Sequence, residues 1–170
     1  AGNVSSEVNS DGVTITQNAP TVEVSSDVVY ATNHSSFPVT VMFNVDVTGF
    51  DENDVIISNG TLAAFIGSGK EYSFHLVPTS EGNVTMDIAD GAAQDVNGIA
   101  SVASLQFTMI YDITKPVMGS ILDGINDDLD WSNAPDSLIA TWTGFVDSLS
   151  GIGEYEYAIG TNAGSTDVLD

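Results

Sequence analysis

Apolar positions alternate with polar ones over four stretches of this chain, and this two-residue period predicts β-strands. The longest stretch has apolar side chains at Val39, Val41, Phe43, Val45 and Val47. The same alternation recurs in Tyr72–Leu76, Val84–Ile88 and Leu105–Tyr111. Because successive side chains of a strand face opposite sides of a sheet, each stretch has one apolar and one mostly polar face. That pattern is typical of antiparallel strands that cover a core on one side only.

Turn-forming dipeptides separate these stretches. Asn59-Gly60, Glu81-Gly82 and Asn97-Gly98 are pairs of this kind, and they favour tight connections between strands. The composition agrees, since the β-branched residues Val, Ile and Thr number 19, 13 and 15 against 8 Leu. Strands that recur every ~8–12 residues with such punctuation predict an all-β fold, an antiparallel β-sandwich.

The pattern also predicts where domains begin and end. Residues 1–18 are polar and are interpreted as an N-terminal linker or the end of a preceding domain. Residues 19–115 provide a complete sandwich, which ends at Pro116 because proline cannot donate to a strand ladder. Residues 116–170 start a second apolar pattern but are too few for a whole sandwich. We expect this second domain to be incomplete, and either missing chain or another subunit would complete it.

Charge narrows the possible functions. The chain has a formal net charge of −22, with 24 acidic residues against Lys70 and Lys115. Such a surface lacks the basic patch that nucleic acids and anionic membranes require, and the cations that phosphate-handling enzymes use. The absence of cysteine excludes disulfides and thiolate chemistry. No apolar run approaches the ~20 residues of a membrane span, so we expect no direct membrane insertion. Because the cations and thiols named above are missing, we also expect no enzyme.

Ordered motifs between residues 47 and 116 resemble the bacterial Ig-like repeat domains of large surface adhesins and secreted multidomain proteins. They are VTGFDENDVIISNGTL (47–62), FIGSGKEYSF (65–74), LVPTSEGNVTMDIADGAAQDVNG (76–98) and YDITKP (111–116). Residues 116–170 are similar to the first half of a fibronectin type III-like module, through LIATWTGFVD (138–147) and SGIGEYEYAIGT (150–161).

The resemblance implies an Ig-like sandwich followed by a partial fibronectin III-like one. It also implies a non-catalytic spacer or cell-adhesion module, located outside the cell or on the bacterial cell surface. The implied partners are neighbouring repeat domains of the same chain, together with cell-surface glycans or proteins.

Aspartates in turns are the main candidate chemistry. Calcium is bound by six to eight oxygen ligands, which Asp-rich loops between β domains can supply. We therefore expect calcium to stiffen the loops and the domain junction. The candidate ligands are Asp51, Asp54, Asp90, Asp95, Asp112, Asp123, Asp128 and Asp130. The alternative interpretation is that these aspartates form turns and keep the chain soluble.

Other chemistry has little support in the sequence. His34 and His75 are expected on the surface, and no G-x-S-x-G nucleophile motif is present. Trp131 is the aromatic residue most suited to ligand contact, whereas Trp142 and Tyr155 are expected in the second core. Two other functions stay open: a carbohydrate-binding accessory module of a secreted enzyme, and a structural subunit of a surface filament or secretion assembly. An exposed aromatic row would favour the first, and an interior aromatic core would favour the spacer.

Overall fold

In the computed structural model, which describes residues 5–8, 14–124, 137–157, 162 and 165, the chain divides between Ile113 and Thr114 into two compact units. We call them unit 1 and unit 2. The described residues contain no α-helix, and their one helical turn is the 3-10 turn η1, Glu52–Asp54. The all-β prediction is therefore confirmed.

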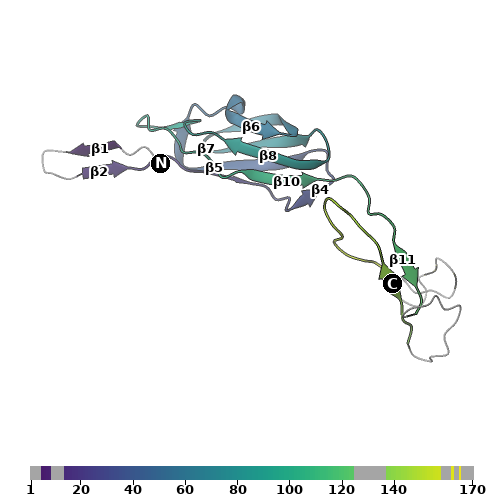
Figure 1. The fold of residues 1–170 in the computed structure, drawn as a ribbon. Coiled ribbons are helices and arrows are strands. Elements are labelled where there is room, and N and C mark those ends of the chain that lie inside the picture. Colours follow the sequence, from purple (N-terminus) through teal and green to yellow (C-terminus); the bar gives the residue numbers. More distant parts are fainter. Residues whose placement is uncertain (1–4, 9–13, 125–136, 158–161, 163–164, 166–170) are drawn as a thin grey trace. The chain divides into compact units, whose positions relative to one another are not determined.

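Unit 1 contains two four-stranded sheets (Figure 1). One sheet has the order β3–β5–β7, with β9 paired to the far end of β5. Its strands are β3 (Val22–Ser25), β5 (Phe37–Thr48), β7 (Gly60–Pro78) and β9 (Gln94–Asp95). The other sheet has the order β4–β10–β8–β6. Its strands are β4 (Ala31–Thr32), β6 (Val55–Ser58), β8 (Gly82–Ile88) and β10 (Phe107–Tyr111).

Two of these strands have features that identify the sandwich type. β4 runs parallel to β10, while every other pair is antiparallel. Within β7 the chain reverses direction. A Cβ built on Gly67 would lie only 2.5 Å from the Cα of Tyr72, five residues further on, which shows that the chain folds back on itself. In an unbroken strand, five residues span about 17 Å. With its two arms counted, β7 supplies two neighbouring strands, and the resulting order is that of the expected Ig-like sandwich.

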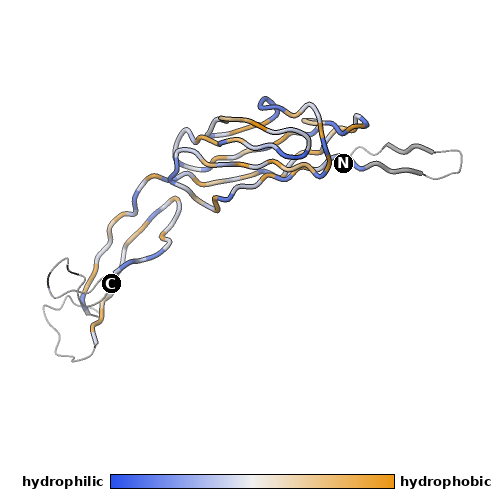
Figure 2. Tube along the Cα trace, turned by 180° about the vertical axis from the view of Figure 1, so that it is seen from behind, coloured by the Kyte–Doolittle hydropathy of each residue, from blue (hydrophilic) through white to orange (hydrophobic). Residues whose placement is uncertain are grey.

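The core lies between the two sheets. The inward side chains of β5 (Phe37, Val39, Val41 and Phe43) are at most 1% exposed, and those of β8 (Val84, Met86 and Ile88) are equally buried. Hydropathy alternates along the strands (Figure 2), as the sequence pattern predicts. Aromatic rings fill the space near one end, where Phe50 meets Phe43 and Tyr72 edge to face at 5.3 and 4.9 Å between ring centroids. Such edge-to-face contacts add to the stabilisation from burial.

Two apolar residues depart from the predicted alternation. Val45 is 38% exposed although Phe43 and Val47 are buried, because the register with β7 shifts between Met42 and Val47 and the chain bulges there. Leu105 is 90% exposed. The expected strand begins only at Phe107, and before it Ser104 bonds Ile88 through both its backbone N–H and its hydroxyl.

The strand directions define two ends of the sandwich, which we name after one aspartate at each. The Asp95 end holds the end of β5 and the beginning of β6, and the chain enters the sandwich there. The Asp112 end holds the end of β10 and the beginning of β8. β3 and β4 both run towards the Asp112 end, where the chain leaves the sandwich.

The segments outside the sandwich are simpler. β1 (Ser5–Val8) and β2 (Thr14–Gln17) form an antiparallel pair that joins neither sheet. The alternation of Val13 and Ile15 indicates only one short strand in residues 1–18, which we interpret as a linker or the end of a preceding domain. In unit 2, β11 (Ser120–Leu122) pairs with β12 (Thr141–Thr143). A bridge between Val117 and Val146 extends this pair. The fibronectin III-like resemblance of this unit stays a prediction.

Candidate functional site

The turn after β5 uses two of the predicted ligand residues as helix caps. The Oδ1 atom of Asp51 accepts from the backbone N–H and the side-chain amide of Asn53, at 2.7 and 2.9 Å. In return, the N–H of Asp51 donates to Oδ2 of Asp54 at 2.8 Å. This reciprocal arrangement is a capping box, which satisfies the free N–H groups of the first helical turn. The sequence DEND therefore folds locally because its carboxylates cap their own turn.

Asp95 organises a second turn at the same end of the sandwich. Its Oδ1 atom accepts from the N–H groups of Asn97 and Ile99 at 2.9 and 2.8 Å. Its backbone carbonyl accepts from the N–H of Gly98, whose φ of 79° suits glycine. The hydrogen bond that the carboxylate accepts from Ile99, more than those from Asn97, lowers the pKa of Asp95 below its ordinary value because it stabilises the ionised form.

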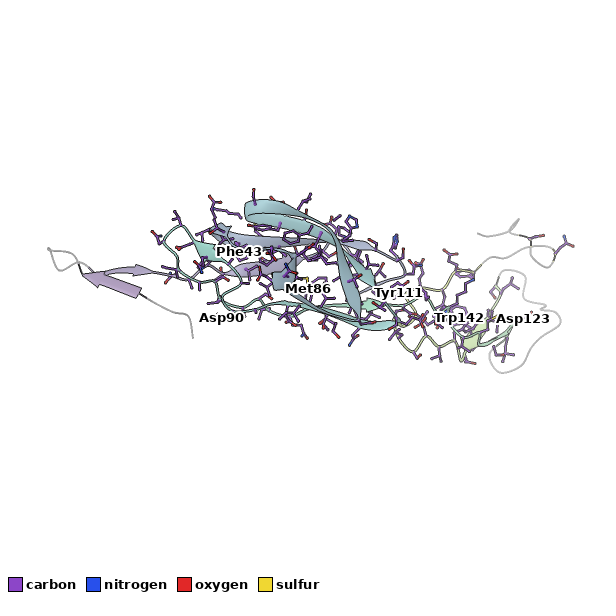
Figure 3. The ribbon with its side chains drawn as sticks, turned by 90° about the horizontal axis from the view of Figure 1, so that it is seen from above. Phe43, Met86, Asp90, Tyr111, Asp123 and Trp142 are labelled. Atoms are coloured by element: carbon purple, nitrogen blue, oxygen red, sulfur yellow. The ribbon has the colours of Figure 1, made fainter. Side chains whose placement is uncertain are left out.

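The remaining candidates lie apart from these turns. Asp90 is exposed in the turn after β8 at the Asp95 end, whereas Asp112 is 7% exposed and follows β10. β8 separates the two ends by about 20 Å at the usual rise per strand residue, and Figure 3 shows Asp90 and Tyr111 towards opposite ends of the sandwich with Met86 between them. Asp112 therefore cannot share a metal ion with the carboxylates of the Asp95 end.

Unit 2 contributes one described candidate. Asp123 is exposed and directly follows β11, while Asp128 and Asp130 lie outside the described residues, as does Trp131. Within the part of the chain that the structure describes, no group of three or more His, Asp or Glu side chains is placed to hold a metal ion. Among the candidates of unit 1, Asp51, Asp54 and Asp95 have turn-forming roles, and calcium stays a prediction.

The structure reveals hydrogen-bonding roles of two polar side chains that the sequence did not predict. Asp147 caps a turn with one oxygen, which accepts from the backbone N–H groups of Leu149, Ser150 and Gly151 at 3.0–3.2 Å. An aspartate followed by Ser and Gly is a known turn signal and could have identified it. Asn59 joins two turns at the Asp112 end through both ends of its side-chain amide, and it has a positive φ of 58°.

The aromatic residues and histidines divide between interior and surface. In unit 1, Phe37, Phe43, Phe50, Tyr72 and Phe74 are all at most 6% exposed. Burial raises the pKa of the Tyr72 hydroxyl. His34 and His75 are exposed, as predicted, and Nδ1 of His75 lies 3.0 Å from the hydroxyl of Ser36.

Unit 2 differs from the sequence-based expectation. Trp142 and Tyr155 contact each other at 5.9 Å between ring centroids. They nevertheless remain 43% and 48% exposed rather than buried in a core. Tyr155 also packs edge to face against Phe145, at 5.8 Å between ring centroids.

Comparison with known proteins gives one match. The family model described as a bacterial Ig-like domain matches residues 16–110, more than half of the chain. No curated protein and no solved structure matches the chain. Among the described residues, no helix is long and apolar enough to cross a bilayer.

Proposed function

The chain belongs to the bacterial Ig-like domain family, and we propose on this basis that it is a spacer that carries tension between neighbouring parts of a bacterial surface protein. The family consists of non-catalytic structural modules and is typical of extracellular surface proteins. Adhesion is then the task of the parts that the spacer presents, and the neighbouring repeats of the same chain are its first partners.

One observation carries the proposal: β4, the second strand of the sandwich, lies beside its last strand, β10, and runs parallel to it. β4 pairs with β10, and the chain enters at the Asp95 end and leaves at the Asp112 end. Tension on the two ends of the sandwich reaches β4 through β3, which runs in the same direction, and pulls β4 and β10 in opposite directions along their length. Their hydrogen bonds, such as those from Ile110 N–H to Tyr30 O and from Asp112 N–H to Thr32 O, both 3.0 Å, are then loaded together in shear.

The interior supports the same function. Five buried rings and the inward residues of β5 and β8 form one apolar cluster between the sheets, so the two sheets cannot slide without exposing it. Each fully buried Phe or Leu contributes roughly 1.5–3 kcal/mol relative to an exposed one. An interior aromatic core favours the spacer over a module that uses an exposed aromatic row.

Calcium is a separate part of the proposal. The described carboxylates of unit 1 are spread over two ends and are partly used as turn caps, so the acidic run that begins at Asp123 is the better candidate. Bound calcium would neutralise repulsion within this run, since hard cations prefer carboxylate oxygens. Calorimetric titration of the full chain with calcium tests this. We expect the wild-type chain to release or absorb heat as calcium binds, and we expect Asp123→Asn to reduce this heat. A flat titration of the wild type at millimolar calcium would contradict the calcium proposal.

The spacer function is tested by pulling the full chain from its two ends in a single-molecule force experiment. Unit 1 is expected to unfold in one abrupt step. The extension released should be roughly 250–300 Å, because about 90 residues from β3 to β10 extend to about 300–320 Å at ~3.3–3.6 Å each, less the few tens of ångströms that separate their ends in the folded sandwich. A gradual extension without an abrupt step would contradict the proposal.

A further inference from the structure

The connection between β3 and β4 presents a strained, exposed tyrosine. The N–H of Ala31 donates to the carbonyl of Val29 at 2.8 Å, and Tyr30 between them has a φ of 66°. A bond from residue i+2 to residue i around a positive φ is a γ-turn of the rare, strained kind. Bulky residues seldom adopt this conformation, which glycine adopts freely.

The strain at Tyr30 is not offset by packing of its side chain. Tyr30 is 69% exposed and Val29 is 79% exposed, so neither side chain contributes to the core. What holds the turn is the backbone: the carbonyl of Tyr30 accepts from Ile110 N–H at 3.0 Å. Glycine at position 30 would keep this bond without the strain. The tyrosine ring is therefore dispensable for the fold, and a backbone outlier of this kind points to a role outside the fold.

Polar groups suited to a ligand follow directly along the chain. Asn33, His34 and Ser35 are all exposed in the loop between β4 and β5. The N–H of His34 donates to the Thr32 hydroxyl at 3.1 Å, which bends the loop two residues after the γ-turn. Proteins bind sugars through groups of this kind: an exposed aromatic ring with an amide, an imidazole and a hydroxyl close to it in the chain. The ring stacks on the C–H face of a pyranose, and the polar groups bond its hydroxyls.

We propose that Tyr30 and the loop Asn33–Ser35 form a binding site for neutral carbohydrate. The charge of the chain selects the class of ligand, since a net charge of −22 repels anionic glycans. A cationic ligand would be attracted over the whole acidic surface and would not need one strained ring. A neutral ligand gains nothing from the long-range field, so its affinity must come from stacking and hydrogen bonds at one place. This inference goes beyond the spacer function and does not depend on it.

The test combines binding and stability measurements on the full chain. Binding is measured on an array of neutral oligosaccharides built from glucose, galactose, mannose and N-acetylglucosamine, and the strongest ligand is titrated by calorimetry. Tyr30→Gly is expected to weaken binding at least tenfold while the melting temperature stays equal or rises. Tyr30→Phe keeps the ring and is expected to bind within about threefold of the wild type. Tyr157→Ala removes an exposed ring of unit 2 and serves as the matched control.

Four results would overturn the site. A lower melting temperature of Tyr30→Gly would mean that the ring supports the fold. Binding that is insensitive to Tyr30→Gly would place the sugar elsewhere, and absence of binding across the array would exclude neutral sugars. Binding only of lysine-rich peptides, tested in parallel, would identify a cationic partner. None of these results changes the unfolding step expected in the force experiment, so failure of this site and failure of the spacer function are distinguishable.

Discussion

Asn59 makes four side-chain hydrogen bonds between two turns of unit 1, and its replacement should lower the stability of this unit. Its Oδ1 atom accepts from the N–H and the hydroxyl of Ser80 at 3.1 and 2.7 Å. Its Nδ2 atom donates to the carbonyls of Ser80 and Asn83 at 2.8 and 3.2 Å. One side chain therefore joins the turn between β6 and β7 to the turn between β7 and β8. Its positive φ of 58° is a conformation that Asn tolerates better than most residues.

The magnitude follows from these bonds. Each hydrogen bond contributes a net ~0.5–1.5 kcal/mol, and the low end applies where the groups are partly solvated. Asn59→Gly removes the four bonds but keeps the backbone unstrained, so a loss of about 2–3 kcal/mol is expected. Asn59→Ala should lower the free energy of unfolding by about 1 kcal/mol more than Asn59→Gly, because a left-handed backbone conformation is strained in alanine but not in glycine. For a domain of this size, 1 kcal/mol corresponds to roughly 4–8 °C in melting temperature.

Urea unfolding followed by circular dichroism measures these differences, with Asn83→Ala as the control. Asn83 is exposed, and it contacts Asn59 only through its backbone carbonyl, which alanine keeps. Asn83→Ala should therefore change the free energy of unfolding by less than about 0.5 kcal/mol. The reasoning is refuted if Asn59→Gly is as stable as the wild type, or if Asn59→Ala and Asn59→Gly are equally stable.

Four further predictions concern other elements. Phe74→Ala should cost about 3–5 kcal/mol in the urea assay, because the ring is 2% exposed and its loss leaves a cavity; a cost below 1 kcal/mol would contradict this. Gly67→Ala should prevent folding, since the new Cβ would meet the carbonyl of Glu71 at the reversal within β7; a folded variant by circular dichroism would refute it. The lowered pKa of Asp95 gives stability that is present above about pH 4 and lost as the pH falls through the folded-state pKa. The free energy of unfolding of Asp95→Asn should therefore fall less steeply than that of the wild type as the pH is lowered below about 4. Trypsin should leave the native chain intact and cut the urea-unfolded chain only after Lys70, because Pro116 blocks the one other basic site, Lys115; a second tryptic fragment boundary by mass spectrometry would contradict it.

The sequence predicted the elements whose structure depends on local pattern. The alternation in Val39–Val47 and Val84–Ile88 identified β5 and β8 because both strands have one face on the core. It failed at Val45, where a bulge set by pairing with β7 turns the side chain outward. β4 could not be predicted at all, since its two residues form a strand only by pairing with β10 about 80 positions away.

The candidate site was predicted less well than the fold, for a physical reason. Aspartate favours turns and calcium sites alike, so its spacing along the chain does not distinguish a cap from a ligand. The structure separates Asp51 and Asp112 to opposite ends and engages Asp51 in its own turn. Tyr30 has no sequence signal, because tyrosine in a strained turn is read as one more strand residue.

The central claim is that the parallel pair β4–β10 makes unit 1 resist tension between its ends, and the direction of pulling tests it most directly. The chain has no cysteine, so introduced cysteines provide unique attachment points. Cysteines at the exposed positions Asn18 and Ile113 load β4 and β10 in shear, whereas cysteines at Asn33 and Ile113, both at the Asp112 end, peel the strands apart one bond at a time. The account predicts an unfolding force several-fold higher for the first pair. Equal forces in the two directions would contradict it.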